Sequence, residues 1–145
     1  MKALIQRVSS SKVEVDEKTV GQINKGLLVF VGIEKQDDLI NAVKMIERIV
    51  SYRVFSDTKD KMNLSLKDIN GSILIVSQFT LAADTKNGTR AGFSTAMQPL
   101  EAEGIYDYIV EKIKALDVDT QCGIFGANMK VSIVNDGPVT FLLNS

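Results

Sequence analysis

Hydrophobic and polar residues alternate in short runs through the first third of the chain. Residues 2–8 and 12–15 have the period of two that is typical of half-buried strands, and residues 20–23 repeat it after a polar turn. Residues 27–33 are apolar throughout apart from Gly32, as expected of a central strand that is buried on both faces. This part of the chain therefore predicts a β-meander that ends in the core of a sheet.

The apolar spacing changes to three and four residues in two later segments, which predicts two amphipathic helices. The first follows Asp37 and Asp38, whose side chains are suited to an N-cap and to early negative charge, and the second begins at Pro99. Between and after the helices, β-type runs occur at residues 72–76, 120–123 and 130–143.

These elements predict one domain over residues 1–145, of the α/β class in its α+β form. We expect an antiparallel-leaning β-sheet with a barrel-like core and two packed helices. The last residues, Phe141, Leu142 and Leu143, are apolar to within two positions of Ser145. A C-terminal strand that is buried, or paired across a homodimer interface, explains that pattern.

The composition excludes several kinds of catalyst. The chain contains no histidine and a single cysteine, Cys122, so neither a Ser-His-Asp nor a Cys-His system can form, and no metal site of histidine or clustered cysteine is expected. No apolar run approaches the roughly 20 residues of a membrane span, so the prediction is a cytoplasmic protein without membrane contact.

The net charge of −1 argues against nonspecific affinity for nucleic acid, which depends on clustered cations. A local basic patch remains compatible with this value. Lys86 and Arg90, and earlier Lys59 and Lys61, lie in polar, loop-like stretches where such a patch could form, although solvated surface charge explains each of them singly.

Residues 135–138, Asn-Asp-Gly-Pro, have two interpretations. Asp-Gly between two apolar runs is a strong signal for a tight hairpin, with Pro138 beginning an edge strand. Alternatively, Gly137 lacks a side chain and Pro138 lacks an N–H, so neighbouring carbonyls can form a recognition surface made of backbone alone. The pattern itself does not decide between them.

Four motifs carry a family resemblance. They are Ser-Gln-Phe-Thr-Leu at residues 77–81, Lys-Met-Asn-Leu-Ser-Leu at 61–66, Gly-Ile-Phe-Gly-Ala-Asn-Met at 123–129 and Asn-Asp-Gly-Pro-Val-Thr at 135–140. Together with Gln-Arg-Val at residues 6–8, they make the chain similar to the bacterial-type D-aminoacyl-tRNA deacylases from its first residue to its last.

The resemblance implies an editing hydrolase that cleaves the ester of a D-amino acid, or of mischarged glycine, on the 3′-terminal ribose of tRNA. It implies a homodimer in which a cis Gly137-Pro138 unit enters the active site of the partner and excludes L side chains. The family roles that transfer are orientation of this motif by Arg7 and a pocket lined by two sets of residues: Gln78, Phe79 and Thr80 on one wall, and Ala127 and Met129 on the other.

An aminoacyl ester is already reactive, so positioning and N–H donors to the developing oxyanion can suffice. We take the backbone amides of Phe79 and Thr80 as these donors and expect no cofactor or metal. The resemblance implies that the ribose 2′-hydroxyl of the substrate transfers the proton, which is consistent with a chain that has no histidine. Two alternatives stay open: a non-enzymatic dimeric module that binds nucleic acid or protein, and a hydrolase of small D-amino acid esters that does not need tRNA.

One segment departs from the family pattern. Members commonly carry Arg-Pro-Ser-Phe after the loop, whereas residues 90–93 read Arg-Ala-Gly-Phe. Glycine in place of a rigid residue predicts a more flexible loop, and no family role in tRNA contact is transferred to Lys86 or Arg90.

Overall fold

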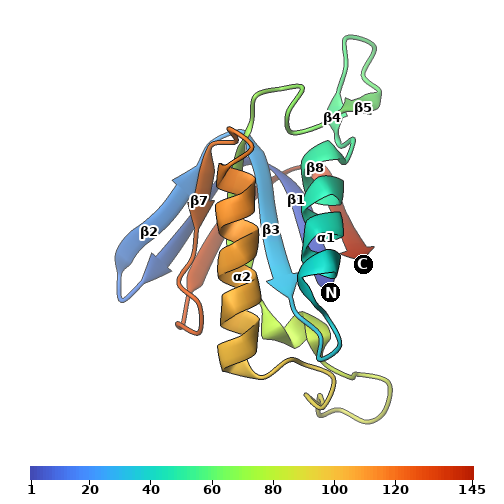
Figure 1. Cartoon of the computed structure of the whole chain (residues 1–145). Helices are drawn as coiled ribbons and strands as arrows, with labels where there is room; N and C mark the ends of the chain where they lie inside the picture. Colours follow the sequence, from blue (N-terminus) through green and yellow to red (C-terminus); the bar gives the residue numbers. More distant parts are fainter.

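The fold is a curved sheet covered on one face by two helices, as a computed structural model of residues 1–145 shows (Figure 1). In chain order the elements are β1 (Lys2–Val15), β2 (Lys18–Ile23), β3 (Gly26–Gly32), α1 (Leu39–Ser51), β4 (Phe55–Ser56), β5 (Met62–Leu64), β6 (Ser72–Ser77), the 3₁₀ helix η1 (Phe79–Ala82), α2 (Pro99–Lys114), β7 (Thr120–Cys122) and β8 (Lys130–Asn144).

The main sheet is mixed, so the predicted antiparallel lean is not what the structure shows. Its order is β2-β1-β3-β6-β7, with β8 on the other side of β1. β1 is antiparallel to β2, β3 and β8, whereas β3, β6 and β7 run parallel to one another. The parallel pairs follow from the connections, because α1 lies between β3 and β6 and α2 between β6 and β7, and helical crossovers return the chain in the same direction.

The sheet curls until elements from its two ends meet. A Cβ atom built on Gly21 of β2 would lie 2.8 Å from the carbonyl oxygen of Cys122 in β7, although the two strands are not neighbours in the sheet order. Only a residue without a side chain permits this approach. The result is the nearly closed, barrel-like core that the apolar pattern predicts.

Both helices pack their apolar stripes against the sheet. Asp38 caps α1 as predicted: its carboxylate accepts from the N–H of Asn41 at 2.9 Å, and the Asn41 side chain accepts from the N–H of Asp38 at 3.1 Å. Tyr106 of α2 is buried and donates to the carbonyl of Ile75 at 2.9 Å, and burial raises the pKa of its hydroxyl. No helix combines the length and the apolar character needed to cross a membrane.

The chain between Lys130 and Asn144 is one strand and not a hairpin. Both arms of β8 pair with the same strand, since Asn135 lies opposite Val8 and Thr140 lies opposite Gln6. Between these two pairs β8 advances by five residues while β1 advances by two. The excess residues of β8 form a bulge at 136–139. The hairpin interpretation of residues 135–138 is wrong because the chain continues in its original direction after the bulge.

The Met1 ammonium group joins the start of β1 to the turn before α1 and to the last residue. It donates to Glu34 Oε2 at 2.8 Å, to Asp37 Oδ1 at 2.6 Å and to Ser145 Oγ at 2.9 Å. Asp37 thus binds a cation, and the capping role belongs to Asp38. Burial raises the pKa of Glu34, but hydrogen bonds and charge from the ammonium group and from Lys2 outweigh it and leave this pKa below its ordinary value.

Because the pKa of Glu34 is lowered in the folded chain, the contribution of its carboxylate to stability depends on pH. The carboxylate stabilises the fold fully above the ordinary glutamate pKa, and this contribution is lost as the pH falls through the lower, folded-state value. We expect Glu34→Gln to lower the urea midpoint at pH 7 by a small amount, with the difference from the unchanged chain shrinking as the pH falls below the ordinary glutamate pKa. A difference that stays constant from pH 7 to pH 3 would show that the ion pair contributes nothing.

Candidate active site

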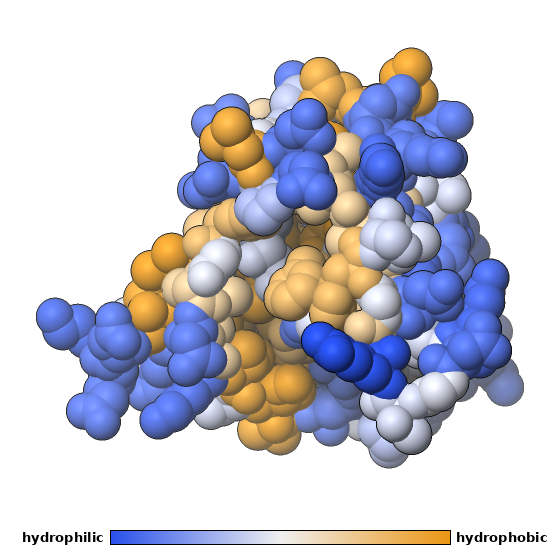
Figure 2. Space-filling model, turned by 90° about the horizontal axis from the view of Figure 1, so that it is seen from below, coloured by the Kyte–Doolittle hydropathy of each residue, from blue (hydrophilic) through white to orange (hydrophobic).

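A cavity of about 600 Å³ opens at the end of the barrel where β3 and β6 finish. Figure 2 views the molecule from this end and shows a hollow among apolar side chains, with hydrophilic groups around it. Its lining comes from Val31, Ile33, Val76, Ser77, Gln78, Phe79, Met97, Pro99, Ala102, Phe125, Gly126, Ala127, Asn128, Met129 and Val131. None of these side chains is an acid or a base, so the cavity offers polar groups and backbone but no residue for proton transfer.

One wall of the cavity is built where β6 passes into η1. A Cβ atom on Gly32 would lie 2.7 Å from the Cβ of Leu81, so the glycine at the end of β3 lets η1 pack directly against that strand. Gln78 and Phe79 consequently line the cavity. Thr80 does not line it: the residue is exposed, and its hydroxyl oxygen accepts from Gln78 Nε2 at 2.6 Å.

The opposite wall is the turn that precedes β8. Ala127 and Met129 line the cavity there, together with Phe125, which residue type alone does not distinguish from ordinary core. A Cβ atom on Gly123 would lie 2.6 Å from the sulfur of Met129, so this glycine provides the space that the methionine side chain occupies. Two motifs that are far apart in sequence therefore face each other across the cavity.

The bulge with Gly137 and Pro138 does not line this cavity. Both residues are exposed, their peptide bond is cis, and Gly137 has a φ of +144°, which side chains strongly disfavour. Asn135 shapes the bulge from inside: its Oδ1 accepts from the N–H of Val139 at 2.7 Å, and its Nδ2 donates to Thr140 Oγ1 at 3.0 Å. Sequence reasoning missed this role of Asn135, although asparagine side chains commonly replace backbone hydrogen bonds in turns.

Arg7 holds the bulge from β1. Its Nε donates to the carbonyl of Asp136 at 2.8 Å, and its Nη1 donates to the carbonyl of Val54 at 2.7 Å, at the base of the β4–β5 arm. In Figure 1 this arm stands at the top of the molecule, whereas η1, whose residue Phe79 lines the cavity, lies at the bottom. The predicted site residues thus form two separate groups within one chain.

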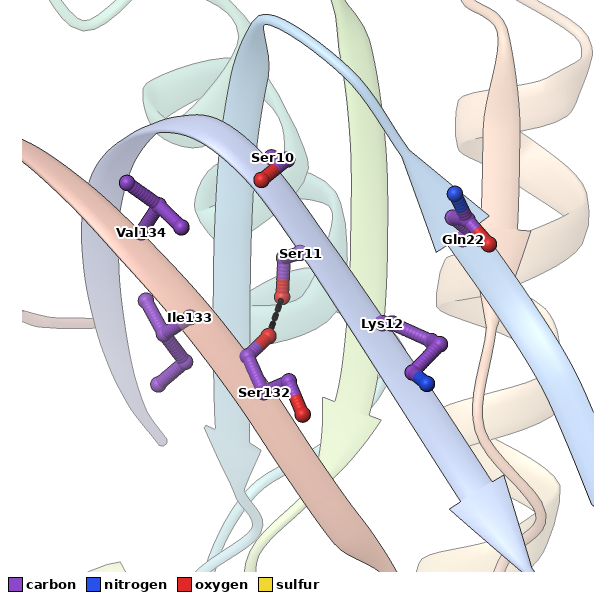
Figure 3. A pocket seen from close by; sticks show the side chains of 7 residues that line it. All are labelled: Ser10, Ser11, Lys12, Gln22, Ser132, Ile133 and Val134. Atoms are coloured by element: carbon purple, nitrogen blue, oxygen red, sulfur yellow. Dashed lines mark hydrogen bonds between the residues drawn. The ribbon is translucent and has the colours of Figure 1, made fainter.

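A second hollow, of about 410 Å³, lies on the outer side of β1, β2 and β8 (Figure 3). Its lining is Ser10, Ser11, Lys12, Gln22, Ser132, Ile133 and Val134. The hydroxyl of Ser11 is already engaged, since it donates to the carbonyl of Ser132 at 2.9 Å. None of the predicted site residues lies here.

The curved mixed sheet, with its two helices and its cavity at one end, places the protein in a known structural class. A solved structure described as "c-Myc DNA Unwinding Element Binding Protein" superposes with a TM-score of 0.95 at 37% identity, covering 100% of this chain and 99% of that one. A probable eukaryotic D-amino acid tRNA deacylase superposes with a TM-score of 0.85 over 98% of this chain and 97% of that one, and at 14% identity it shares the fold.

Sequence comparison defines the family. The model of the D-Tyr-tRNA(Tyr) deacylase family matches residues 4–144. A D-aminoacyl-tRNA deacylase of Vibrio cholerae is 57% identical over the whole of both chains, and one of Pseudoalteromonas translucida is 54% identical over 99% of each. The chain belongs to the D-Tyr-tRNA(Tyr) deacylase family, which confirms the resemblance drawn from the motifs.

Proposed function

We propose that this chain is a D-aminoacyl-tRNA deacylase, a hydrolase that cleaves the ester between a D-amino acid and the terminal ribose of tRNA. The relatives that match it over their full length carry this name. The observation that carries the chemical proposal is the cavity lining, which is apolar enough to receive an aminoacyl group and contains no acid or base. A reaction in such a cavity needs a substrate that brings its own proton-handling group.

The ribose 2′-hydroxyl next to the ester is that group in our proposal. Water adds to the ester carbonyl carbon and gives one proton to the 2′-hydroxyl oxygen. The 2′-hydroxyl passes its own proton to the ribose 3′-oxygen as the bond from that oxygen to the carbonyl carbon breaks, which leaves the free amino acid and a 3′-terminal ribose with both hydroxyls. Phe79 and Thr80 occupy the first two positions of η1, where backbone N–H groups have no partner within the helical turn. Their N–H groups are our candidates for stabilising the oxyanion, a role worth about 10²- to 10³-fold in rate per donor in well-studied enzymes.

The proposed selection of D-amino acids uses the bulge of a second copy of the chain. Gly137 and Pro138 are exposed and distant from their own cavity, and β8 offers its outer edge without a partner in this chain. In a homodimer, the bulge of one protomer would enter the cavity of its partner, and its carbonyls would meet any L side chain at the α-carbon. Glycine has no side chain to meet them and should be hydrolysed as well.

Parallel measurement of matched D- and L-aminoacyl-tRNA tests this function. We expect rapid release of the D-amino acid and a value of kcat/KM for the L form that is lower by about 10³-fold, since a steric clash worth about 4 kcal/mol suffices. Equal rates would remove the chirality claim. A D-aminoacyl-tRNA whose terminal ribose is 2′-deoxy should be inert, and its hydrolysis at the normal rate would instead indicate a general esterase for D-amino acid esters.

Thr80 is predicted to act through its backbone and not through its hydroxyl. The side chain lies outside the cavity lining and already accepts a hydrogen bond from Gln78. We therefore expect Thr80→Ala to keep kcat within about threefold of the unchanged chain, because a backbone donor survives the substitution. Loss of deacylation in this variant, with tRNA binding intact, would instead make the hydroxyl a nucleophile.

A non-enzymatic role in binding nucleic acid is the second candidate, because the name of the 37% identical structure refers to a DNA element. The discriminating observation is activity at micromolar enzyme. A chain that retains nucleic acid but deacylates no D-aminoacyl-tRNA would favour this candidate.

A further inference from the structure

The loop between η1 and α2 contains a short finger at residues 84–92, closed at its base by a pair of hydrogen bonds. The N–H of Asp84 donates to the carbonyl of Gly92 at 2.8 Å, and the N–H of Gly92 donates to the carbonyl of Asp84 at 2.9 Å. Asp84 Oδ1 also accepts from the N–H of Lys86 at 3.0 Å, which orders the first residues of the tip. The sequence departure at Gly92 therefore falls at the closure of the finger.

The base of the finger is fixed to the mouth of the cavity. Phe93 packs on Phe79, a lining residue, with ring centroids 5.0 Å apart, and the hydroxyl of Thr95 donates to the carbonyl of Ala82 at the end of η1. The N–H of Met97, another lining residue, donates to the carbonyl of Ile33 at 3.1 Å. The position of the finger relative to the cavity is thus set by packing and by hydrogen bonds.

The tip of the finger carries two cations without partners. Lys86 and Arg90 are exposed, and neither side chain makes an ion pair or a hydrogen bond within the chain. The one carboxylate of the finger, Asp84, is occupied by the backbone N–H of Lys86. An arginine and a lysine held this way are suited to phosphate groups, which they bind through charge and through several N–H donors.

The other side of the cavity carries carboxylates together with lysines. Asn128, a lining residue, also borders another hollow whose further lining is Glu14, Asp16, Glu17 and Lys130. Glu14 pairs with Lys12 at 3.1 Å. In Figure 1 the β1–β2 turn is at the lower left and the finger at the lower right, with η1 between them. A polyanion that delivers its end to the cavity would find unpaired cations on the side of the finger, whereas carboxylates offset the lysines on the other side.

We propose that Lys86 and Arg90 bind backbone phosphates of the single-stranded 3′ end of tRNA, so that the RNA reaches the cavity over the finger and not over the β1–β2 turn. This inference rests on the proposed function, because it concerns how the same substrate is delivered to the same cavity. It also explains how a chain with a net charge of −1 holds a polyanion: the attraction is local and asymmetric.

The test compares two substrates that share the ester but differ in phosphates: D-tyrosyl-tRNA and 3′-O-D-tyrosyl-adenosine. We expect Lys86→Ala/Arg90→Ala to reduce kcat/KM on the tRNA substrate by about tenfold at low salt. The slope of log kcat/KM against log salt should become shallower by about 1.4, because each phosphate of a single strand that a cation neutralises contributes about 0.7. On the adenosine ester, which has no phosphate, the rate should stay within about twofold.

The matched control is Lys44→Ala/Lys114→Ala, which removes the same charge from α1 and α2. Both lysines are exposed, and neither side chain makes a hydrogen bond or an ion pair. This control should leave both substrates unaffected. A finger variant that loses activity equally on both substrates, or on neither, would overturn the proposal. Inactivity of the unchanged chain on both esters would refute the proposed function instead. The role of the finger would then be tested by the Kd for uncharged tRNA: the finger variant must raise this Kd, and the control variant must leave it unchanged.

Discussion

Replacing Gly137 by alanine is expected to lower the preference for D- over L-aminoacyl-tRNA by about 100-fold, mainly through faster hydrolysis of the L form. The φ of Gly137 is +144°, and an added Cβ would lie 2.6 Å from Val139 Cγ2 and 2.9 Å from Val139 N. The bulge must change shape to accept it. Carbonyls that move even slightly cease to exclude an L side chain, and losing about 2.7 kcal/mol of steric exclusion corresponds to about 100-fold in rate.

The measurement is kcat/KM for D- and L-tyrosyl-tRNA, with the two values expressed as a ratio. Pro138→Ala should change this ratio in the same direction. Gly104→Ala is the control, because an added Cβ there would meet nothing within 4 Å and the residue belongs neither to the bulge nor to the cavity lining. Unchanged ratios in both bulge variants would assign the bulge a purely structural role.

Gly26→Ala is expected to reduce the free energy of unfolding by about 3 kcal/mol or more, which is at the upper end for inserting a methyl group into a packed site. Gly26 begins β3 and pairs with Ser72 of the parallel strand β6. A Cβ atom there would lie 1.8 Å from the carbonyl oxygen and 2.8 Å from the carbonyl carbon of Ser72, and a backbone neighbour cannot move aside by changing rotamer. The pair of strands that forms the centre of the core would have to separate at its start.

Urea unfolding followed by circular dichroism measures this loss. Gly104→Ala is the matched control, because the same methyl group on α2 meets nothing within 4 Å. In an exposed helical position alanine should raise the free energy of unfolding by about 0.5–1 kcal/mol. Opposite signs for the two substitutions are the expected result, and a small effect at Gly26 would mean that β3 and β6 can shift apart without loss.

The sequence predicts most elements of this fold, because their signals are local. The run at residues 27–33 corresponds to β3, whose side chains are buried except for Phe30, and the spacing after Asp38 corresponds to α1. The predicted antiparallel meander corresponds to β1, β2 and β3, whereas the parallel pairs β3–β6 and β6–β7 are not part of the prediction. The alternation of strand, helix and strand from residue 26 to residue 122 already favours parallel pairs.

For the site, the sequence predicts which residues belong to a motif better than it predicts which distant residues they contact. Motif resemblance predicts a pocket with Gln78, Phe79, Ala127 and Met129 in its walls, and the structure brings all four to one cavity. It could not supply the contact from Arg7 to the carbonyl of Val54, because a bond to a backbone atom 47 residues away leaves no trace in residue type or period. The insertion of the bulge into the cavity of a partner is likewise not visible in a single chain, and it stays a prediction about two protomers.

The pairing of both arms of β8 with β1 also determines how this protein can change in length. Leu143 on one arm is buried and Val131 on the other packs against the core, so neither arm can slip along β1 without moving an apolar residue out of place. An insertion or deletion between Asn135 and Thr140 is therefore confined to the projecting segment. The fold provides a position where the reach of a recognition element can be lengthened or shortened, in evolution or by design, while the register of the sheet stays as it is.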